Sequence, residues 1–370
     1  RGGAGVGEEV VEFEFEFEGE FEGEFEGEGE VEVEGIRGGA GDRRAGMGRL
    51  MAGLAMGLLA ATPIGAQDGV LLVVNKSEST LSFVHAASRT EVAEVETGHA
   101  PHEVAVSPDG RWAYVSDYGT GPEPGSTVTI VDVAARSTVG TIDLGRHTRP
   151  HGITVTADGS VWVTTEGSAH VLKLDPERRA IVLEAETGQD VTHMVVVAPG
   201  HGRAYTANIG SGTVTAVDTE TGEVVAQLAT GAGAEGLALG PAGDRVYVTN
   251  RSAGTLSEID VASNTVTRSL EVGSFPIRVE VLPDGGRALV SNAQANELAV
   301  VDLAGWVVER RIPVGAVPVG IQITPDGSLA FVANTEADKV SVVDLGEWRV
   351  IGEIVAGDEP DGMAWVGEPR

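Results

Sequence analysis

Short segments in which apolar and polar residues alternate recur along most of the chain in a fixed order. One line opens each unit, and it reads HAPHEVAVSPDG from residue 99, RPHGITVTADG from 149, DVTHMVVVAPG from 190, AEGLALGPAG from 234, FPIRVEVLPDG from 275, VPVGIQITPDG from 317 and EPDGMAWVG from 359. After each of the first six lines come three more strand-like segments, such as RVYVTN, TVTAVD and EVVAQLATG. Four short strands in each repeat are typical of one blade of a β-propeller.

The spacing of equivalent residues predicts how many blades there are. One position of the opening line falls at 102, 151, 193, 235, 277, 319 and 361, so the step is 49 once and then 42 five times. The second strand ends at equivalent positions that include one earlier copy, and these residues are Asn75, Asp117, Thr165, Asn208, Asn250, Asn292 and Asn334. We therefore expect an all-β, seven-bladed propeller with four antiparallel strands per blade. Residues 70–98 and 359–367 are expected to share one blade and close the ring, which leaves no open sheet edge between the ends.

Recurring aspartates fit turn positions. Asp109, Asp158, Asp284 and Asp326 each precede Gly and predict hairpins between first and second strands. A second set ends the third strands, where a carboxylate can cap the next turn, and His85 takes that place in the shared blade. The members of this second set are Asp132, Asp175, Asp218, Asp260, Asp302 and Asp344.

The segments RVYVTN at 245 and LAFVANTEADKVSVVDL at 329 carry the YVTN signature or its pattern. On these residues the chain resembles the YVTN-repeat, YncE-like β-propeller family, which is related to cytochrome d1-type and lactonase-like propellers. The resemblance covers roughly residues 70–367. It implies the fold strongly and the activity weakly, because such propellers serve as binding modules, cell-surface proteins and enzymes.

Two N-terminal segments differ in composition from the repeats. Residues 1–46 contain the alternation VEFEFEFEGEFEGEFEGEGEVEVEG, which we interpret as a low-complexity, disordered or mistranslated segment outside the fold. Residues 47–66 read MGRLMAGLAMGLLAATPIGA, and an apolar run that is too short to span a membrane predicts a secretory signal peptide. The propeller is then residues 67–370, located in the periplasm or secreted.

The charge excludes one class of partner. The net charge is −31, and without the 15 acidic and 4 basic residues of the first 46 it is −20. Phosphate backbones bind clustered Lys and Arg, so we expect no nucleic-acid partner. We expect a monomer that is not an integral membrane protein. The absence of Cys excludes a thiolate metal site and covalent c-type haem.

The seven equivalent positions of the opening line converge at one mouth of the central channel, and we call them the inner ring. They are His102, His151, His193, Glu235, Ile277, Val319 and Asp361. A random distribution would place roughly 0.2 of a His there, whereas three are found. Imidazole and carboxylate suit Zn, Cu, Fe or Ni, so His102, His151, His193 and Glu235 form a candidate metal site. The alternative is that these His residues line a wet channel mouth and bond to nearby backbone.

Two further features border this ring. The long step between 102 and 151 predicts a loop insertion in DYGTGPEPGSTV, on the same face as the ring, where it could shield the mouth or contact a partner. Arg278 neighbours Ile277, and Arg149 precedes Pro150, so either could bind an anionic group or simply lie at the surface.

These observations leave three functions open. The leading hypothesis is a binding or interaction module, with Asp361 and Arg278 joining the His-rich ring to hold a small ligand, a metal or a protein partner at the channel mouth. The first alternative is a metal-dependent hydrolase of lactonase type. The second, implied by the resemblance to cytochrome d1 domains, is noncovalent binding or handling of a tetrapyrrole.

Overall fold

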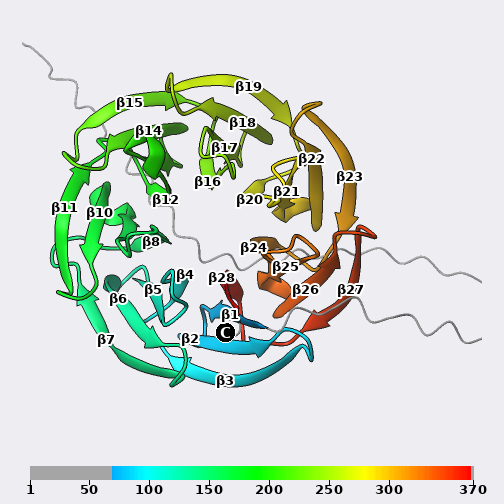
Figure 1. Cartoon of the computed structure of the whole chain (residues 1–370), viewed down its shortest axis with the longest axis horizontal. Helices are drawn as coiled ribbons and strands as arrows, with labels where there is room; N and C mark the ends of the chain where they lie inside the picture. The colour runs from blue at the N-terminus through cyan, green and yellow to red at the C-terminus, as the bar shows by residue number, and fades with distance from the viewer. Residues whose placement is uncertain (1–68, 368–370) are drawn as a thin grey trace, which may run out of the picture. The chain divides into compact units, whose positions relative to one another are not determined.

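The computed structural model of the chain describes residues 69–367, and it confirms the seven-bladed propeller (Figure 1). The predicted segments 1–46 and 47–66 lie outside the described residues. Each blade is a four-stranded antiparallel sheet whose inner strand faces the channel. Adjacent inner strands contact one another all the way round, in the order β28, β4, β8, β12, β16, β20, β24 and back to β28.

The strands follow the predicted repeat. Blade 1 contains β28 (Pro360–Gly367), β1 (Gly69–Asn75), β2 (Thr80–His85) and β3 (Thr90–Glu96). Blade 2 contains β4 (Pro101–Val106), β5 (Trp112–Gly119), β6 (Pro124–Asp132) and β7 (Ser137–Asp143). Blade 3 contains β8 (Pro150–Val155), β9 (Val161–Thr165), β10 (His170–Asp175) and β11 (Ala180–Glu186). Blade 4 contains β12 (Thr192–Ala198), β13 (Arg203–Asn208), β14 (Thr213–Asp218) and β15 (Val224–Ala229).

The remaining three blades have the same order. Blade 5 contains β16 (Ala234–Leu239), β17 (Arg245–Asn250), β18 (Thr255–Asp260) and β19 (Thr265–Glu271). Blade 6 contains β20 (Pro276–Val281), β21 (Arg287–Asn292), β22 (Glu297–Asp302) and β23 (Val307–Pro313). Blade 7 contains β24 (Pro318–Ile323), β25 (Leu329–Asn334), β26 (Lys339–Asp344) and β27 (Arg349–Ile354). Four single 3-10 turns occur within the described residues, namely η1 (Glu166–Ser168), η2 (Pro199–His201), η3 (Ala293–Ala295) and η4 (Thr335–Ala337). No helix in residues 69–367 is long and apolar enough to cross a membrane.

The second strands owe their sequence pattern to burial on both faces. Their central residues are almost completely buried between neighbouring blades, as in β9 and β17. The Asn that ends this strand is buried as well, and in four blades its amide donates to a hydroxyl seven residues later on the third strand. These bonds join Asn75 to Ser82, Asn208 to Thr215, Asn250 to Ser257 and Asn334 to Ser341, at 2.9 to 3.1 Å. The repeated Asn therefore satisfies a buried polar position and locks the hairpin.

The recurring acidic turn residues have the predicted capping role. Asp132 accepts a bond from the backbone N–H of Ala135 at 2.9 Å, and the five equivalent aspartates bind the turns that follow them. In blade 1 the backbone N–H of Ser88 donates to Nδ1 of His85, so the imidazole replaces the carboxylate.

The insertion divides between two places in blade 2. Asp117 and Asp132 are 15 positions apart, whereas the equivalent residues of blades 3 to 7 are 10 apart. Five of the seven extra residues therefore lengthen the β5–β6 hairpin, as predicted. The other two lie between Asp132 and His151, ahead of β8.

Candidate functional site

The inner-ring residues reach the channel mouth because the chain makes a left-handed turn just before each inner strand. The residue two positions before each ring residue has φ between 45° and 74°, and these residues are Ala100, Arg149, Val191, Gly233, Phe275, Val317 and Glu359. Only one of them is Gly. A non-Gly residue in this region costs about 1 kcal/mol or more, so the fold maintains strain at the mouth in six blades.

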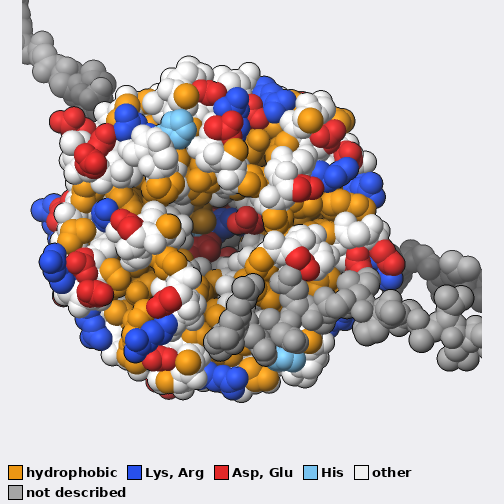
Figure 2. All heavy atoms as spheres, viewed as in Figure 1, with side chains coloured by type: hydrophobic (Ala, Val, Ile, Leu, Met, Phe, Trp, Pro, Cys, Tyr) orange, Lys and Arg blue, Asp and Glu red, His pale blue; other side chains and the backbone are white. Residues whose placement is uncertain are grey.

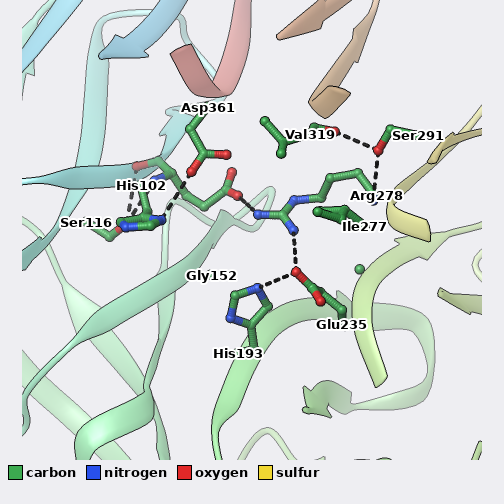
Figure 3. Close-up of polar contacts among 12 residues, drawn as sticks. His102, Ser116, Gly152, His193, Glu235, Ile277, Arg278, Ser291, Val319 and Asp361 are labelled. Atoms are coloured by element: carbon green, nitrogen blue, oxygen red, sulfur yellow. Dashed lines mark hydrogen bonds and ion pairs between the residues drawn. The ribbon is translucent and has the colours of Figure 1, made fainter. Parts of the chain in front are cut away.

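A hydroxyl on the second strand then fixes the ring backbone. The Oγ1 of Thr249 accepts from the N–H of Gly236 at 2.8 Å and donates to the carbonyl of Ile277 in the next blade at 2.8 Å. Ser291 does the same between Arg278 and the carbonyl of Val319 (Figure 3). Thr164 makes the same pair of bonds in blade 3, so a hydroxyl ties the ring backbone to the neighbouring blade in blades 3, 5 and 6.

The structure brings the predicted polar ring residues together. The imidazole of His102 lies 4.6 Å from that of His151, which in turn lies 3.8 Å from that of His193, measured between ring centroids. Oε1 of Glu235 is 3.6 Å from Nε2 of His193, and Oδ2 of Asp361 is 3.1 Å from Nδ1 of His102. All except His102 are buried. Ile277 and Val319 add no polar side-chain atom to the ring.

A second ring of side chains surrounds the first, and the sequence analysis missed it. Its members occupy the repeat position after Asn75 and its six equivalents, and we call them the outer ring: Lys76, Tyr118, Glu166, Ile209, Arg251, Ala293 and Thr335. The amine of Lys76 is 3.8 Å from Asp361, and the guanidinium of Arg251 is 3.0 Å from Oε2 of Glu235. The repeat register itself was the signal that could have revealed them, because this position is polar in five blades.

Glu166 is the most consequential member of the outer ring. Its Oε1 accepts from Nδ1 of His193, and its Oε2 accepts from the hydroxyl of Tyr118 at 2.5 Å. Burial raises the pKa of Glu166, but the bonds from His193 and Tyr118 outweigh burial, so the pKa lies below its ordinary value. Glu166 is therefore ionised and holds His193 with a proton on Nδ1.

The turn η1 that carries Glu166 is firmly docked. The N–H of Glu166 donates to the carbonyl of Arg149 at 3.0 Å, and the N–H of Gly167 donates to that of Thr148 at 3.1 Å. A Cβ at residue 167 would lie 2.3 Å from Oγ1 of Thr148, so a larger residue would force the Thr148 side chain to move. The hydroxyl of Ser168 forms a hydrogen bond of 3.0 Å with Nδ1 of His147. These contacts hold the turn that carries Glu166 against the segment that precedes β8.

The free nitrogen of His193 faces an acceptor. With Nδ1 protonated, Nε2 carries a lone pair in the neutral imidazole, and it points at the Glu235 carboxylate. Nε2 of His193 is buried without a hydrogen-bond partner and faces Oε1 of Glu235, whereas Oε2 of Glu235 is 3.0 Å from the Arg251 guanidinium. Two facing acceptors repel unless a cation, either a proton or a metal ion, lies between them. Figure 3 shows Glu235 between His193 and the guanidinium of Arg278.

His151 is a second nitrogen donor, and its ring packs against that of His193. Its Nδ1 is buried and has no hydrogen-bond partner. Burial, and then the neighbouring His193 and His102, lower the pKa of His151 well below its ordinary value. The imidazole is therefore neutral at pH 7, which is the form that binds metal ions.

The compact group of metal-ligand types differs from the predicted set. His151, Glu166 and His193 each offer one ligand atom, and these atoms lie within 4.8 Å of one another. His102 is instead engaged with Asp361. Glu235 approaches His193 on the side opposite Glu166. The structure thus places two of the predicted nitrogen ligands together and offers two carboxylates, one on each side of His193.

Below the mouth an ion pair crosses the channel. Arg278 of blade 6 donates through Nη2 to Oε1 of Glu103 in blade 2, and both side chains are about nine-tenths buried. Burial lowers the pKa of Arg278, but the carboxylates of Glu103, Asp361 and Glu235 outweigh it and raise the pKa. Burial also raises the pKa of Glu280, next to Glu103, to about 8. Side chains of both charges are visible at the bottom of the central hollow in Figure 2.

A separate cavity lies at the other end of the inner strands. It has a volume of about 410 Å³ and is lined mainly by apolar residues, among them Val104, Ile153, Met363 and Trp365. It contains no inner-ring residue. The cavity is therefore separate from the inner ring.

Comparison with known proteins identifies one family and several solved structures with a similar fold. The model of the Virginiamycin B lyase family matches residues 138–349, which is more than half of the chain. No curated protein matches the sequence. The solved structures that are similar include a hydrazine synthase of Kuenenia stuttgartiensis, with 20% identity and a TM-score of 0.67, over 79% of this chain and 99% of that one.

Two other solved structures have related folds. A protein described as a putative 6-phosphogluconolactonase from Bacteroides uniformis is 14% identical, with a TM-score of 0.68 over 81% of this chain and 100% of that one. The dihydro-heme d1 dehydrogenase NirN is 16% identical, with a TM-score of 0.57 over 81% of this chain and 75% of that one. At these identities the similarity shows a shared fold alone.

Proposed function

The chain belongs to the Virginiamycin B lyase family, and from this premise we propose that it is an exported β-propeller that binds one divalent transition-metal ion at the mouth of its channel. The observation that carries the proposal is the gap between Nε2 of His193 and Oε1 of Glu235. Two ligand atoms that each lie about 2.1 Å from a tetrahedral metal ion are about 3.4 Å apart, and the observed separation is 3.6 Å. Export rests on the signal-like residues 47–66.

We assign distinct roles to the surrounding residues. His193 and Glu235 are ligands, and His151, whose ring packs against that of His193, supplies the second nitrogen. Glu166 is a positioning residue, because both of its oxygens already accept hydrogen bonds. A carboxylate that orients a metal-bound His through its other nitrogen is a common arrangement. Two nitrogen donors favour Zn, Cu, Fe or Ni over Mg.

Zinc titration tests this function. We expect chelator-treated protein to bind one equivalent of Zn²⁺ at this site by isothermal titration calorimetry, and Zn²⁺ at 100 times its Kd should raise the free energy of unfolding by about 2.7 kcal/mol. His193→Ala should weaken this binding by about 100-fold, because it removes a ligand and the anchor of Glu166. The matched control is His201→Ala, an exposed His on η2. Equal Zn²⁺ affinity in His193→Ala and wild type would contradict the site.

The two carboxylates beside His193 can be separated by substitution. We expect Glu166→Gln to weaken Zn²⁺ binding by about 10- to 100-fold, because the amide no longer fixes the His193 tautomer but the ligands remain. Glu235→Gln should weaken Zn²⁺ binding as much as His193→Ala does, since it removes a ligand. Titration of both variants measures the difference. The reverse order, with Glu166→Gln the more damaging, would make Glu166 the ligand and Glu235 a bystander.

An enzyme is the second candidate. The family description names a lyase, and one similar structure is described as a putative lactonase, so a metal ion with an open position could activate water or polarise a carbonyl here. Hydrolysis of a panel of lactones by the Zn²⁺-loaded protein, lost in Glu235→Gln, would favour this function over binding alone. Tetrapyrrole binding remains a prediction from the fold resemblance, and the visible absorption spectrum of the purified protein checks it.

A further inference from the structure

A buried guanidinium beside the proposed metal site lacks a partner on one nitrogen. Nη2 of Arg278 binds Glu103, but Nη1 has no hydrogen-bond partner, although the side chain is only 9% exposed. Oε1 of Glu235 lies 4.0 Å from Nη1, which is beyond hydrogen-bond distance. Leaving a charged donor unpaired in a buried position is costly, so Nη1 is a candidate contact for an atom of a bound ligand.

The charges of the mouth cancel before any ion is bound. Three carboxylates each contact a base, in the pairs Glu103 with Arg278, Glu235 with Arg251, and Asp361 with Lys76. The fourth carboxylate, Glu166, accepts a hydrogen bond from the hydroxyl of Tyr118. The guanidinium of Arg149 lies 3.5 Å from the same hydroxyl, so its charge balances that of Glu166. A divalent cation therefore adds two positive charges to these four balanced acid–base pairs in a low-dielectric site.

A metal ion with an open coordination position, next to a guanidinium nitrogen without a partner, would be suited to an anion. The planar arrangement of two oxygens in a carboxylate can contact a metal ion with one atom and a guanidinium N–H with the other. Lys76, Arg149 and Arg251 are partly exposed around the opening, and they would steer an anion past the otherwise acidic surface.

We propose that the metal-loaded mouth binds a small carboxylate, with one oxygen on the metal ion and the other on Nη1 of Arg278. This inference rests on the proposed metal site. It extends that proposal by naming the chemical class of the second ligand and the residue that recognises it.

Cobalt substitution tests the inference separately from metal binding. Protein loaded with Co²⁺ is titrated with sodium acetate, and the visible absorption of the ion reports ligand exchange. We expect a saturable spectral change with acetate, a weaker one with inorganic phosphate, and none with acetamide, which has no charge. Arg278→Gln should weaken acetate binding at least tenfold. The matched control, Arg203→Gln, alters an Arg paired with Asp218 away from the mouth and should leave the acetate affinity unchanged.

The outcomes are distinguishable. Failure to bind Co²⁺ overturns the proposed function, whereas Co²⁺ binding without a saturable acetate response overturns only the carboxylate. Equal acetate affinity in Arg278→Gln and wild type also overturns it, and tighter binding of phosphate than acetate replaces the carboxylate with another anion. Arg278→Gln leaves the Glu103 carboxylate buried without its partner, so the double variant Glu103→Gln, Arg278→Gln is measured in parallel. It should show the same loss of acetate affinity if Arg278 recognises the anion.

Discussion

Deletion of residues 359–370 is expected to abolish the cooperative unfolding transition of the propeller. The deletion removes β28, which pairs with β1 in blade 1 and lies between β24 and β4. Met363 packs in the apolar cluster shared with blade 7, and Val366 packs in the cluster shared with blade 2. The strand therefore joins the two ends of the ring through both of its faces.

The expected loss in the free energy of unfolding is comparable with the total stability of a domain. Burying a side chain such as Met or Val stabilises by about 1.5–3 kcal/mol, and a domain is typically stable by about 5–15 kcal/mol. The deletion also leaves the inner edge of β1 without hydrogen-bond partners, which promotes aggregation. Circular dichroism during heating and size-exclusion chromatography measure both effects. The control removes only residues 368–370, and a cooperative transition within a few degrees of the control would show that the ring does not need its closing strand.

The blade count was predictable because each blade is made of local hairpins. The Asn that ends a second strand bonds to a hydroxyl seven residues later, so the repeat in the sequence is also the contact in space. Closure was predictable for the same reason: residues 70–98 contain three strands of a blade, and only 359–367 repeat the fourth. Where contacts are periodic, spacing alone determines the register.

The inner ring was predictable, but the contacts of its side chains were only partly so. His151, His193 and Glu235 converge because they occupy one repeat position. Glu166 was missed because it lies in a turn of blade 3 and acts on His193 of blade 4. The period of 42 residues says which positions are equivalent and not how far one blade is offset against the next. That offset decides which outer-ring residue contacts which inner-ring residue, and it depends on packing between blades.

The Arg278–Glu103 ion pair was missed for a different reason. Both residues occupy the position after the ring residue, where four other blades have Gly152, Gly236, Gly320 and Gly362. A Cβ on Gly320 would lie 2.1 Å from the carbonyl oxygen of residue 361 in the next blade. The repeat therefore indicates a position that closely approaches the neighbouring backbone, and it gives no sign that two blades use it to span the channel.

Glu103→Ala should lower the free energy of unfolding by about 3 kcal/mol, because it leaves the Arg278 guanidinium buried without its principal partner. Removing one member of a buried ion pair typically costs about 3–5 kcal/mol, and the lower figure is expected here because Glu235 and Asp361 also stabilise the charge. Urea denaturation measures the change. In the double variant Glu103→Gln, Arg278→Gln most of the loss should be recovered, since no charge is then stranded. The control, Glu309→Ala, breaks a more exposed pair with Arg287 and should cost less than about 1 kcal/mol.

The comparison between these two acids also bears on ligand recognition. If Glu103→Ala costs no more than Glu309→Ala, water must already solvate Arg278, and its free nitrogen would not be held for a carboxylate. A loss near 3 kcal/mol, recovered in the double variant, means that Glu103 fixes the guanidinium across the channel. Recognition of an anion by Nη1 needs that fixed orientation, because a guanidinium that is already held by one nitrogen loses little entropy when the other binds. The stability of the ion pair and the selectivity of the mouth would then share one cause.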